Sequence, residues 1–156
     1  MNIQTILTLG ALVILSLTSL RFNGAVMHKT TSEVENKVML TAFSLADDLI
    51  EEIKVKAYDE TTRPFPTNNP LTLTPVANLG KENSFYDDVD DYNNYTKYVS
   101  APHAENYTIS CKVDYVSQTN PDQVSSIQTF CKRAIVTVSS PYMRNPIKLS
   151  SIFTLK

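Results

Sequence analysis

The chain has 156 residues, with 14 Lys or Arg against 16 Asp or Glu, so its formal net charge at pH 7 is -2. It contains no cluster of basic residues, which argues against a nucleic-acid-binding surface. Beyond an apolar N-terminal run, enough residues remain for one modest domain rather than two.

The chain begins with an apolar run from Ile3 to Leu20 that carries no ionisable side chain. As a helix these residues would span about 27 Å, close to the hydrocarbon thickness of a bilayer. A buried helix of a soluble core would need more protein around it. A cleaved secretory signal would begin with basic residues, which Met-Asn-Ile-Gln lacks, although Gly24-Ala25 resembles a cleavage site. The run therefore predicts a retained hydrophobic helix.

Small hydroxyl residues interrupt the apolar run and would let helices approach closely and hydrogen-bond across an interface. They are Thr5, Thr8, Ser16, Thr18 and Ser19. They favour packing against other helices over a lone lipid anchor. The residues that we expect in this helix-to-helix assembly are Ile3, Gln4, Thr5, Ile6, Leu9, Val13 and Leu17.

Past Arg21 the apolar residues become periodic and line one face of a helix. The stripe expected to pack against the rest of the chain consists of Val34, Val38, Leu45, Leu49 and Ile53. Gly24 and residues 28–32 are weak points, and the S-x-x-E capping box of Ser32 and Glu35 could restart the helix after a local break.

A continuous helix over residues 2–58 would be about 85 Å long, more than a head of about a hundred residues can bury. The excess must lie in lipid or against copies of the same chain. We therefore expect an α+β protein with a helical stalk at residues 1–58, of which 1–28 are hydrophobic. A globular head with a small antiparallel β-sheet would occupy residues 59–156.

The proline-rich segment from Arg63 to Pro70 should end the helix, because prolines remove donors and favour extended backbone. Residues 71–76 alternate in polarity and indicate a short edge strand. An acidic loop follows, with oxygen-bearing side chains at Asp87, Asp88, Asp90, Asp91 and Asn93. Five such side chains could coordinate calcium, although the EF-hand spacing is not met. A solvated acidic loop without an ion is the alternative, and no other cofactor is expected.

Two further triplets match the N-glycosylation pattern, at Asn94 and Asn106. Such triplets also arise by chance in chains rich in asparagine and threonine. They predict exposure of both asparagines more strongly than modification.

Three segments alternate in polarity as half-buried strands do: residues 107–116, 127–138 and 147–155. Turns are expected around Pro121 and between Pro141 and Pro146. If the first hairpin folds symmetrically about Pro121, Cys111 and Cys131 face each other within reach of a disulfide. That bridge would indicate an oxidising compartment.

The sequence offers no constellation for nucleophilic catalysis. His28 lies in the helical segment, His103 stands beside a proline, and no phosphate-binding glycine loop occurs. We therefore do not expect an enzyme.

The order of these segments resembles the type IV pilin and type II secretion pseudopilin superfamily: an apolar helix that continues into an amphipathic half, then a small sheet with a late disulfide. The stretch from Phe85 to Asn93 also resembles an F-D-D-V-D-D-Y segment of minor pilins and pseudopilins. Mature chains of the family usually have glutamate at position five, where this chain has Thr5. The basic leader of the family's precursors is also missing, so Met1 is either the first mature residue or the initiator of a leaderless relative.

In the family, the glutamate at position five is thought to pair with the terminal amine of a neighbouring subunit. Thr5 offers only a neutral hydrogen bond, so subunit register would depend on packing and on Gln4, Thr5 and Thr8. Alternatively, position five faces other apolar helices.

The resemblance implies a structural subunit that sits in the cytoplasmic membrane before assembly and then polymerises into an extracellular filament on the cell surface. Its partners would be copies of itself in a helical homopolymer. One alternative is a minor pseudopilin of a secretion or DNA-uptake machine. The other is a membrane-anchored extracellular module that binds a ligand through its tyrosine-rich loop.

Overall fold

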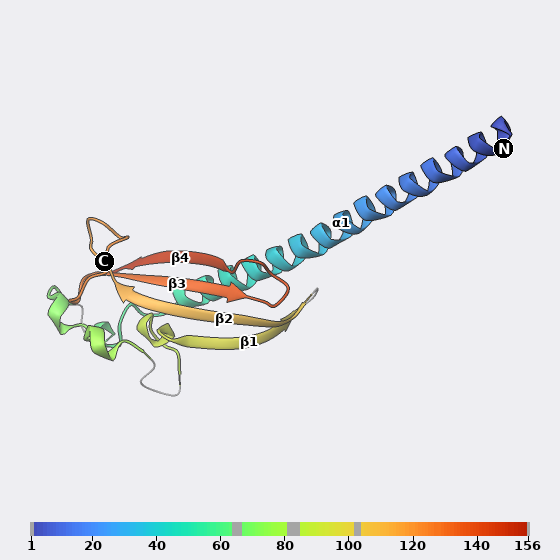
Figure 1. The fold of residues 1–156 in the computed structure, drawn as a ribbon. Helices are drawn as coiled ribbons and strands as arrows, with labels where there is room; N and C mark the ends of the chain where they lie inside the picture. Colours follow the sequence, from blue (N-terminus) through green and yellow to red (C-terminus); the bar gives the residue numbers. More distant parts are fainter. Residues whose placement is uncertain (1, 64–66, 81–84, 102–103, 156) are drawn as a thin grey trace. The chain divides into compact units, whose positions relative to one another are not determined.

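The computed structural model describes residues 2–63, 67–80, 85–101 and 104–155. One long helix, α1 (Ile3–Lys54), precedes four strands: β1 (Tyr95–Ala101), β2 (Ala104–Tyr115), β3 (Cys131–Ser139) and β4 (Ile147–Thr154). The strands form one antiparallel sheet in the order β1-β2-β3-β4 (Figure 1). The predicted α+β class, a long N-terminal helix packed on a small antiparallel sheet, is confirmed.

Helix α1 contains no proline and runs without interruption through Gly24 and residues 28–32, so the local break considered from the sequence is absent. It ends at Lys54, four residues before the expected end at Tyr58. The cause lies in the next residues, where the backbone N–H of Ala57 donates to Asp87 (3.3 Å) and its carbonyl accepts from Val89 (3.0 Å). Extended pairing with the acidic loop thus replaces another helical turn.

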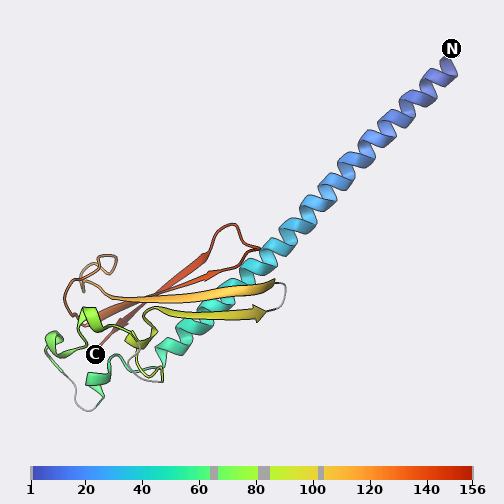
Figure 2. The ribbon, with the colours of Figure 1, turned by 60° about the horizontal axis from the view of Figure 1, so that its bottom comes forward.

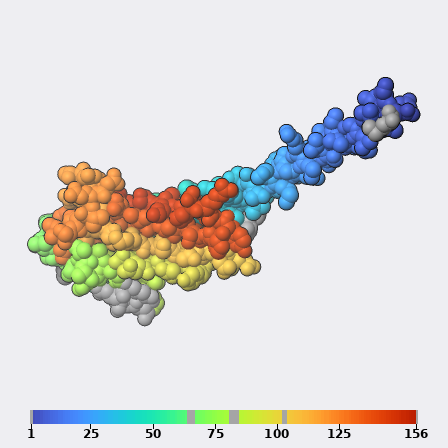
Figure 3. Space-filling model, viewed as in Figure 1, coloured from blue at the N-terminus to red at the C-terminus, as the bar shows by residue number. Residues whose placement is uncertain are grey.

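The chain divides into two compact units, residues 1–37 and residues 38–156. In the first unit every residue from 3 to 34 is exposed. In the second unit, called the head below, the remaining part of α1 lies across one face of the sheet (Figure 2). Figure 3 shows the opposite face of the sheet, where α1 does not lie over the strands.

One face of α1 forms the helical side of the head's core, and it carries two alanines that let the sheet approach closely. The buried residues are Val38, Ala42, Ala46, Leu49, Ile50 and Ile53. They pack against inward-facing side chains of β2 and β3, including Tyr107, Ile109, Val113, Ala134 and Val136. Of the stripe expected from the sequence, Leu45 is half-buried against this core and Val34 is 53% exposed.

The sequence predicts a meander of three main strands and leaves room for a fourth; the sheet has four, and the one outside the three predicted segments is β1. Strand β1 was missed because its side chains are mostly exposed and its sequence contains only weak alternation. The expected edge strand at residues 71–76 is wrong, since Pro70–Thr72 and Val76–Asn78 form 3₁₀ turns. The side chain of Asn69 starts the first of these turns by accepting the N–H of Leu71 at 3.1 Å.

The predicted disulfide is wrong, and both cysteines are free. Cys111 pairs with Val136, five positions further along β3 than Cys131. Because side chains alternate between the faces of a sheet, this odd offset puts the two cysteines on opposite faces, about 16 Å apart along the strands. The register differs because the connection is asymmetric: Val116 and Val124 form a bridge that folds the loop back on the end of β2.

Replacing Ile53 by alanine should lower the head's free energy of unfolding by about 2–5 kcal/mol, because Ile53 is fully buried and the change leaves a cavity. The matched control is Ile6→Ala in the first unit, where the side chain is 52% exposed and the effect should stay within about 0.5 kcal/mol. Urea unfolding of the full chain in detergent, followed by tyrosine fluorescence, measures both. Equal effects would contradict the packing described above.

The cysteine arrangement predicts two free thiols. A maleimide should label both cysteines when the protein is unfolded without a reducing agent, and prior reduction should not raise the extent of labelling. Mass spectrometry measures the number of adducts. Labelling that appears only after reduction would show that the two cysteines form a disulfide and would contradict this prediction.

Candidate functional site

The first unit presents large apolar side chains on all sides of the helix. Their exposed fractions include 77% for Ile3, 57% for Leu9, 53% for Val13 and 54% for Leu17. Gln4, Thr5 and Ile6 are exposed on the same helix. The helix is long and apolar enough to cross a membrane, by length and composition.

The hydroxyl groups of Thr5, Thr8, Ser16 and Thr18 donate to backbone carbonyls three or four residues earlier. Thr5 Oγ1 donates to Asn2 at 2.6 Å, Thr8 to Thr5 at 3.0 Å, and Ser16 to Val13 at 2.9 Å. Their protons are therefore satisfied without a partner helix. This removes much of the penalty for placing a hydroxyl in an apolar environment and leaves small side chains at which helices can approach.

A second candidate site is a fully buried cationic side chain in the head, Lys132 on β3. Its Nζ donates to Asp59 Oδ2 at 2.9 Å, to Asp90 Oδ1 at 2.5 Å and to the carbonyl of Tyr58 at 2.9 Å. Lys132 and Asp59 are both 0% exposed and Asp90 is 2% exposed. We call these three residues the lysine cluster.

Three separate elements supply the lysine cluster. Asp59 is the N-cap of the 3₁₀ turn Glu60–Thr62, and Asp90 begins the 3₁₀ turn Asp90–Tyr92. Lys132 faces the interior because it alternates with Ala134 and Val136 along β3. The rings of Tyr58 and Tyr115 flank its Nζ, with centroids at 4.7 Å and 5.3 Å.

The two carboxylates of the lysine cluster are held differently. Asp59 Oδ1 accepts from the N–H and hydroxyl of Thr61, and Oδ2 accepts from the N–H of Thr74 at 3.0 Å. Burial alone would raise the pKa of Asp59, but Lys132 and these hydrogen bonds lower it below its ordinary value. Burial raises the pKa of Asp90 despite the opposing effect of Lys132.

Sequence reasoning missed the lysine cluster. A signal was present, since Lys132 falls in phase with the inward-facing apolar residues of β3. Asp59 and Asp90 could not be assigned to it, because they lie 73 and 42 residues away in connecting turns.

The structure brings together three of the five residues proposed as calcium ligands. Oxygen atoms of Asp87, Asp88 and Asp91 lie within 4.8 Å of one another. Asp90 instead contacts Lys132, and the Asn93 amide spans from the carbonyl of Leu79 to the N–H of Val113.

Oxygens of the three grouped carboxylates already have protein donors. Asp87 pairs with Arg63, Asp88 accepts the N–H of Asp91, and Asp91 accepts the N–H groups of Asp87 and Asp88. A cation would have to compete with these donors. Calcium binding stays a prediction.

Tyrosines connect the acidic loop to the sheet and to α1. Tyr92 is fully buried and donates to Glu52 Oε1 at 2.7 Å, and the rings of Tyr86, Tyr92 and Tyr95 contact one another at centroid distances of 5.0–5.6 Å. Tyr107 is also buried, whereas Tyr98 is 76% exposed.

Both asparagines of the glycosylation triplets are exposed. Both also adopt left-handed backbone, with φ of 61° at Asn94 and 64° at Asn106. Asn106 lies where the β1-β2 register shifts, so it accommodates a bulge. Glycosylation stays a prediction.

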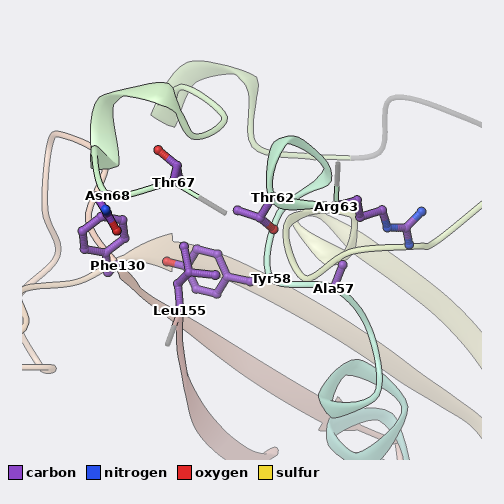
Figure 4. Close-up of a pocket in the computed structure, with 8 residues that line it drawn as sticks. All are labelled: Ala57, Tyr58, Thr62, Arg63, Thr67, Asn68, Phe130 and Leu155. Atoms are coloured by element: carbon purple, nitrogen blue, oxygen red, sulfur yellow. The ribbon is translucent and has the colours of Figure 1, made fainter. Parts of the chain in front are cut away.

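The head also has an open hollow of about 450 Å³, lined in part by Tyr58, Phe130, Leu155, Thr62 and Arg63. In Figure 4 the guanidinium of Arg63 points away from the other lining side chains. It pairs with Asp87, and Tyr58 donates to the carbonyl of Thr129 at 2.9 Å. His28 lies on α1, and His103 lies outside the described residues.

No family model matches the chain, and searches of curated proteins and of solved structures find no match either.

The acidic loop predicts a pH dependence of stability through Asp88. Burial and the neighbouring Asp90 raise the pKa of Asp88 from 3.8 to about 7. The folded state then binds more protons than the unfolded chain between these values, so the free energy of unfolding should fall as pH rises through this window. The slope from one such group reaches at most about 1.4 kcal/mol per pH unit.

Replacing Asp88 by asparagine removes the titrating carboxyl and should flatten this slope. The control is Asp48→Asn, which changes an exposed carboxylate of α1 and should leave the slope unchanged. Urea unfolding at several pH values measures all three proteins. A wild-type slope that survives in Asp88→Asn would exclude Asp88 as its source.

Proposed function

We propose that the chain is a structural subunit of a pilin-like extracellular filament. The apolar part of α1 holds the subunit in a membrane before assembly and packs against copies of itself afterwards. The head then forms the outer surface of the filament. The subunit needs no cofactor for this role.

The observation that supports this proposal best is the change in the apolar pattern along one continuous helix. From Val38 onward one stripe of α1 packs on the sheet, whereas from Ile3 to Leu20 large apolar side chains point in all directions and are exposed. A helix that is apolar all round is stable in lipid or among other helices. Only the last turns of α1 are buried in its own domain. The apolar part before them therefore needs lipid or other helices around it.

Transfer from lipid to a filament core is driven by close packing, because lipid tails are as apolar as the side chains that they cover. The small residues Thr5, Thr8 and Ser16, with hydroxyl protons already satisfied, permit this packing without leaving unpaired donors. Contacts between different surfaces of identical subunits produce open helical assemblies.

The helix also lacks the charge by which pilins are thought to set subunit register. Thr5 donates to the carbonyl of Asn2, the residue just before α1. We infer that register in this filament depends on the shape of the apolar surface and on contacts between heads.

Replacing Leu9 by glutamate should strongly reduce assembly, because a charge in an apolar helix interface costs about 2.5–3.5 kcal/mol. Filament yield should fall at least about tenfold, since every 1.4 kcal/mol changes an equilibrium constant tenfold. Electron microscopy of material sheared from cells that express the chain measures the yield. Leu9→Met keeps volume and helix propensity and should assemble normally.

The head's unfolding free energy should be the same in both variants, since Leu9 belongs to the first unit. Normal filaments from Leu9→Glu would refute assembly through this helix. Wild-type protein that occurs only as membrane-bound monomer would favour an anchored module instead.

A further inference from the structure

The lysine cluster has a geometry that filament assembly does not require. A buried ammonium contacts two buried carboxylates, and burying such ions is expensive unless every partner is well placed. Apolar residues in place of all three would fill this end of the sheet without that penalty. The arrangement therefore calls for a chemical explanation.

We propose that Lys132 and Asp90 become joined by an intramolecular isopeptide bond, with Asp59 acting as the base. The geometry points to this reaction because Lys132 Nζ lies 2.5 Å from Asp90 Oδ1 and 2.9 Å from Asp59 Oδ2 in a site closed to solvent. Nucleophile, acceptor and base are thus held in contact before any reaction.

The contacts of the two carboxylates assign their roles. Asp59 keeps four donors besides Lys132: the N–H and hydroxyl of Thr61, the N–H of Thr74, and the Tyr115 hydroxyl at 3.4 Å. They keep Asp59 ionised beside Lys132, so it is available to take a proton, and they make its carbon a poor electrophile. The Asp90 carboxylate contacts Lys132 and the side chain of Asp88 and has fewer donors than Asp59, so Asp90 is the acceptor.

The reaction balances without an oxidant or a co-reactant. A bond forms between Lys132 Nζ and Asp90 Cγ, and one C–O bond of Asp90 breaks. The oxygen leaves as water and takes two protons from the Lys132 ammonium, which Asp59 accepts and passes on in turn. One ammonium and one carboxylate become one neutral amide and one water molecule.

The surroundings favour the forward reaction. Fixed contact between the groups replaces a bimolecular encounter, which is worth effective concentrations of about 10⁵ M or more. The rings of Tyr58 and Tyr115 flank Nζ and exclude water that would otherwise solvate the ions and reverse the reaction. When the Lys132 ammonium is consumed, Asp59 keeps its hydrogen bonds from Thr61, Thr74 and Tyr115, so its negative charge stays compensated.

The bond would tie the acidic loop to the start of β3 across 42 residues of sequence. It would give the head a covalent link that its two separated cysteines cannot supply. The inference does not depend on filament assembly, because all three residues belong to the head.

Intact mass spectrometry of the full chain, purified in detergent from a bacterial host, tests the proposal. The measured mass should be lower than the sequence mass by one water, about 18 Da. Proteolysis should release a branched peptide that contains Lys132 and Asp90. The full sequence mass, or a water loss without a branched peptide, as in succinimide formation, would overturn the proposal.

Three variants separate the roles. Asp90→Asn presents an amide that loses ammonia instead of water, so its product should have the same mass as the linked wild type. Asp59→Asn removes the base and Lys132→Arg removes the nucleophile while keeping the charge, so both should show their full sequence masses. Circular dichroism checks their folding. If these variants do not fold, the mass of the wild-type protein and its branched peptide still decide whether the bond forms. A branched peptide that contains Asp59 in place of Asp90 would overturn the assigned roles.

Discussion

The rest of the structure depends on the change of apolar pattern within α1. From Val38 to Ile53 the helix has one apolar face, and that face, with alanines at positions 42 and 46, sets the close approach of the sheet. Before Val38 the helix has no such restriction, and residues 3–34 bury none of their side chains. The same helix therefore has one apolar face where it packs on the sheet and apolar side chains all round before that, a pattern typical of helices in lipid or among other helices.

The head is stabilised differently at its two ends. Where α1 crosses the sheet, contacts are apolar and involve residues such as Ile53, Tyr107 and Val136. Near the start of β3, the turns after α1 are held mainly by polar contacts: Lys132 to Asp59 and Asp90, and Tyr115 to Thr74. A smaller apolar cluster around Leu73, Leu79 and Tyr115 supplements them.

The sequence was sufficient for the features that depend on periodicity. Uniform apolarity and a stripe every three or four residues predicted α1, and alternation predicted β2, β3 and β4 within a few residues. Features that depend on pairing between distant segments could not be predicted from the sequence. The β2-β3 register depends on how the 117–130 connection folds back through Val116 and Val124, and no local pattern marks that bridge. A symmetric hairpin was the simplest assumption, and it placed the cysteines wrongly.

The same limit explains why the acidic stretch was interpreted as one loop with one purpose. Its five polar residues all have oxygen-bearing side chains, but they do not share one partner. Asp87 pairs with Arg63, Asp90 with Lys132, and Asn93 connects Leu79 with Val113. Spacing could not distinguish these partners, because each is contributed by a segment far away in sequence. What the stretch provides is a junction at which the turns after α1, the start of β1 and the start of β3 are held together by charge. A junction of this kind is strong while its ions stay buried and paired, and breaking one partner leaves an uncompensated charge that weakens all of its segments together.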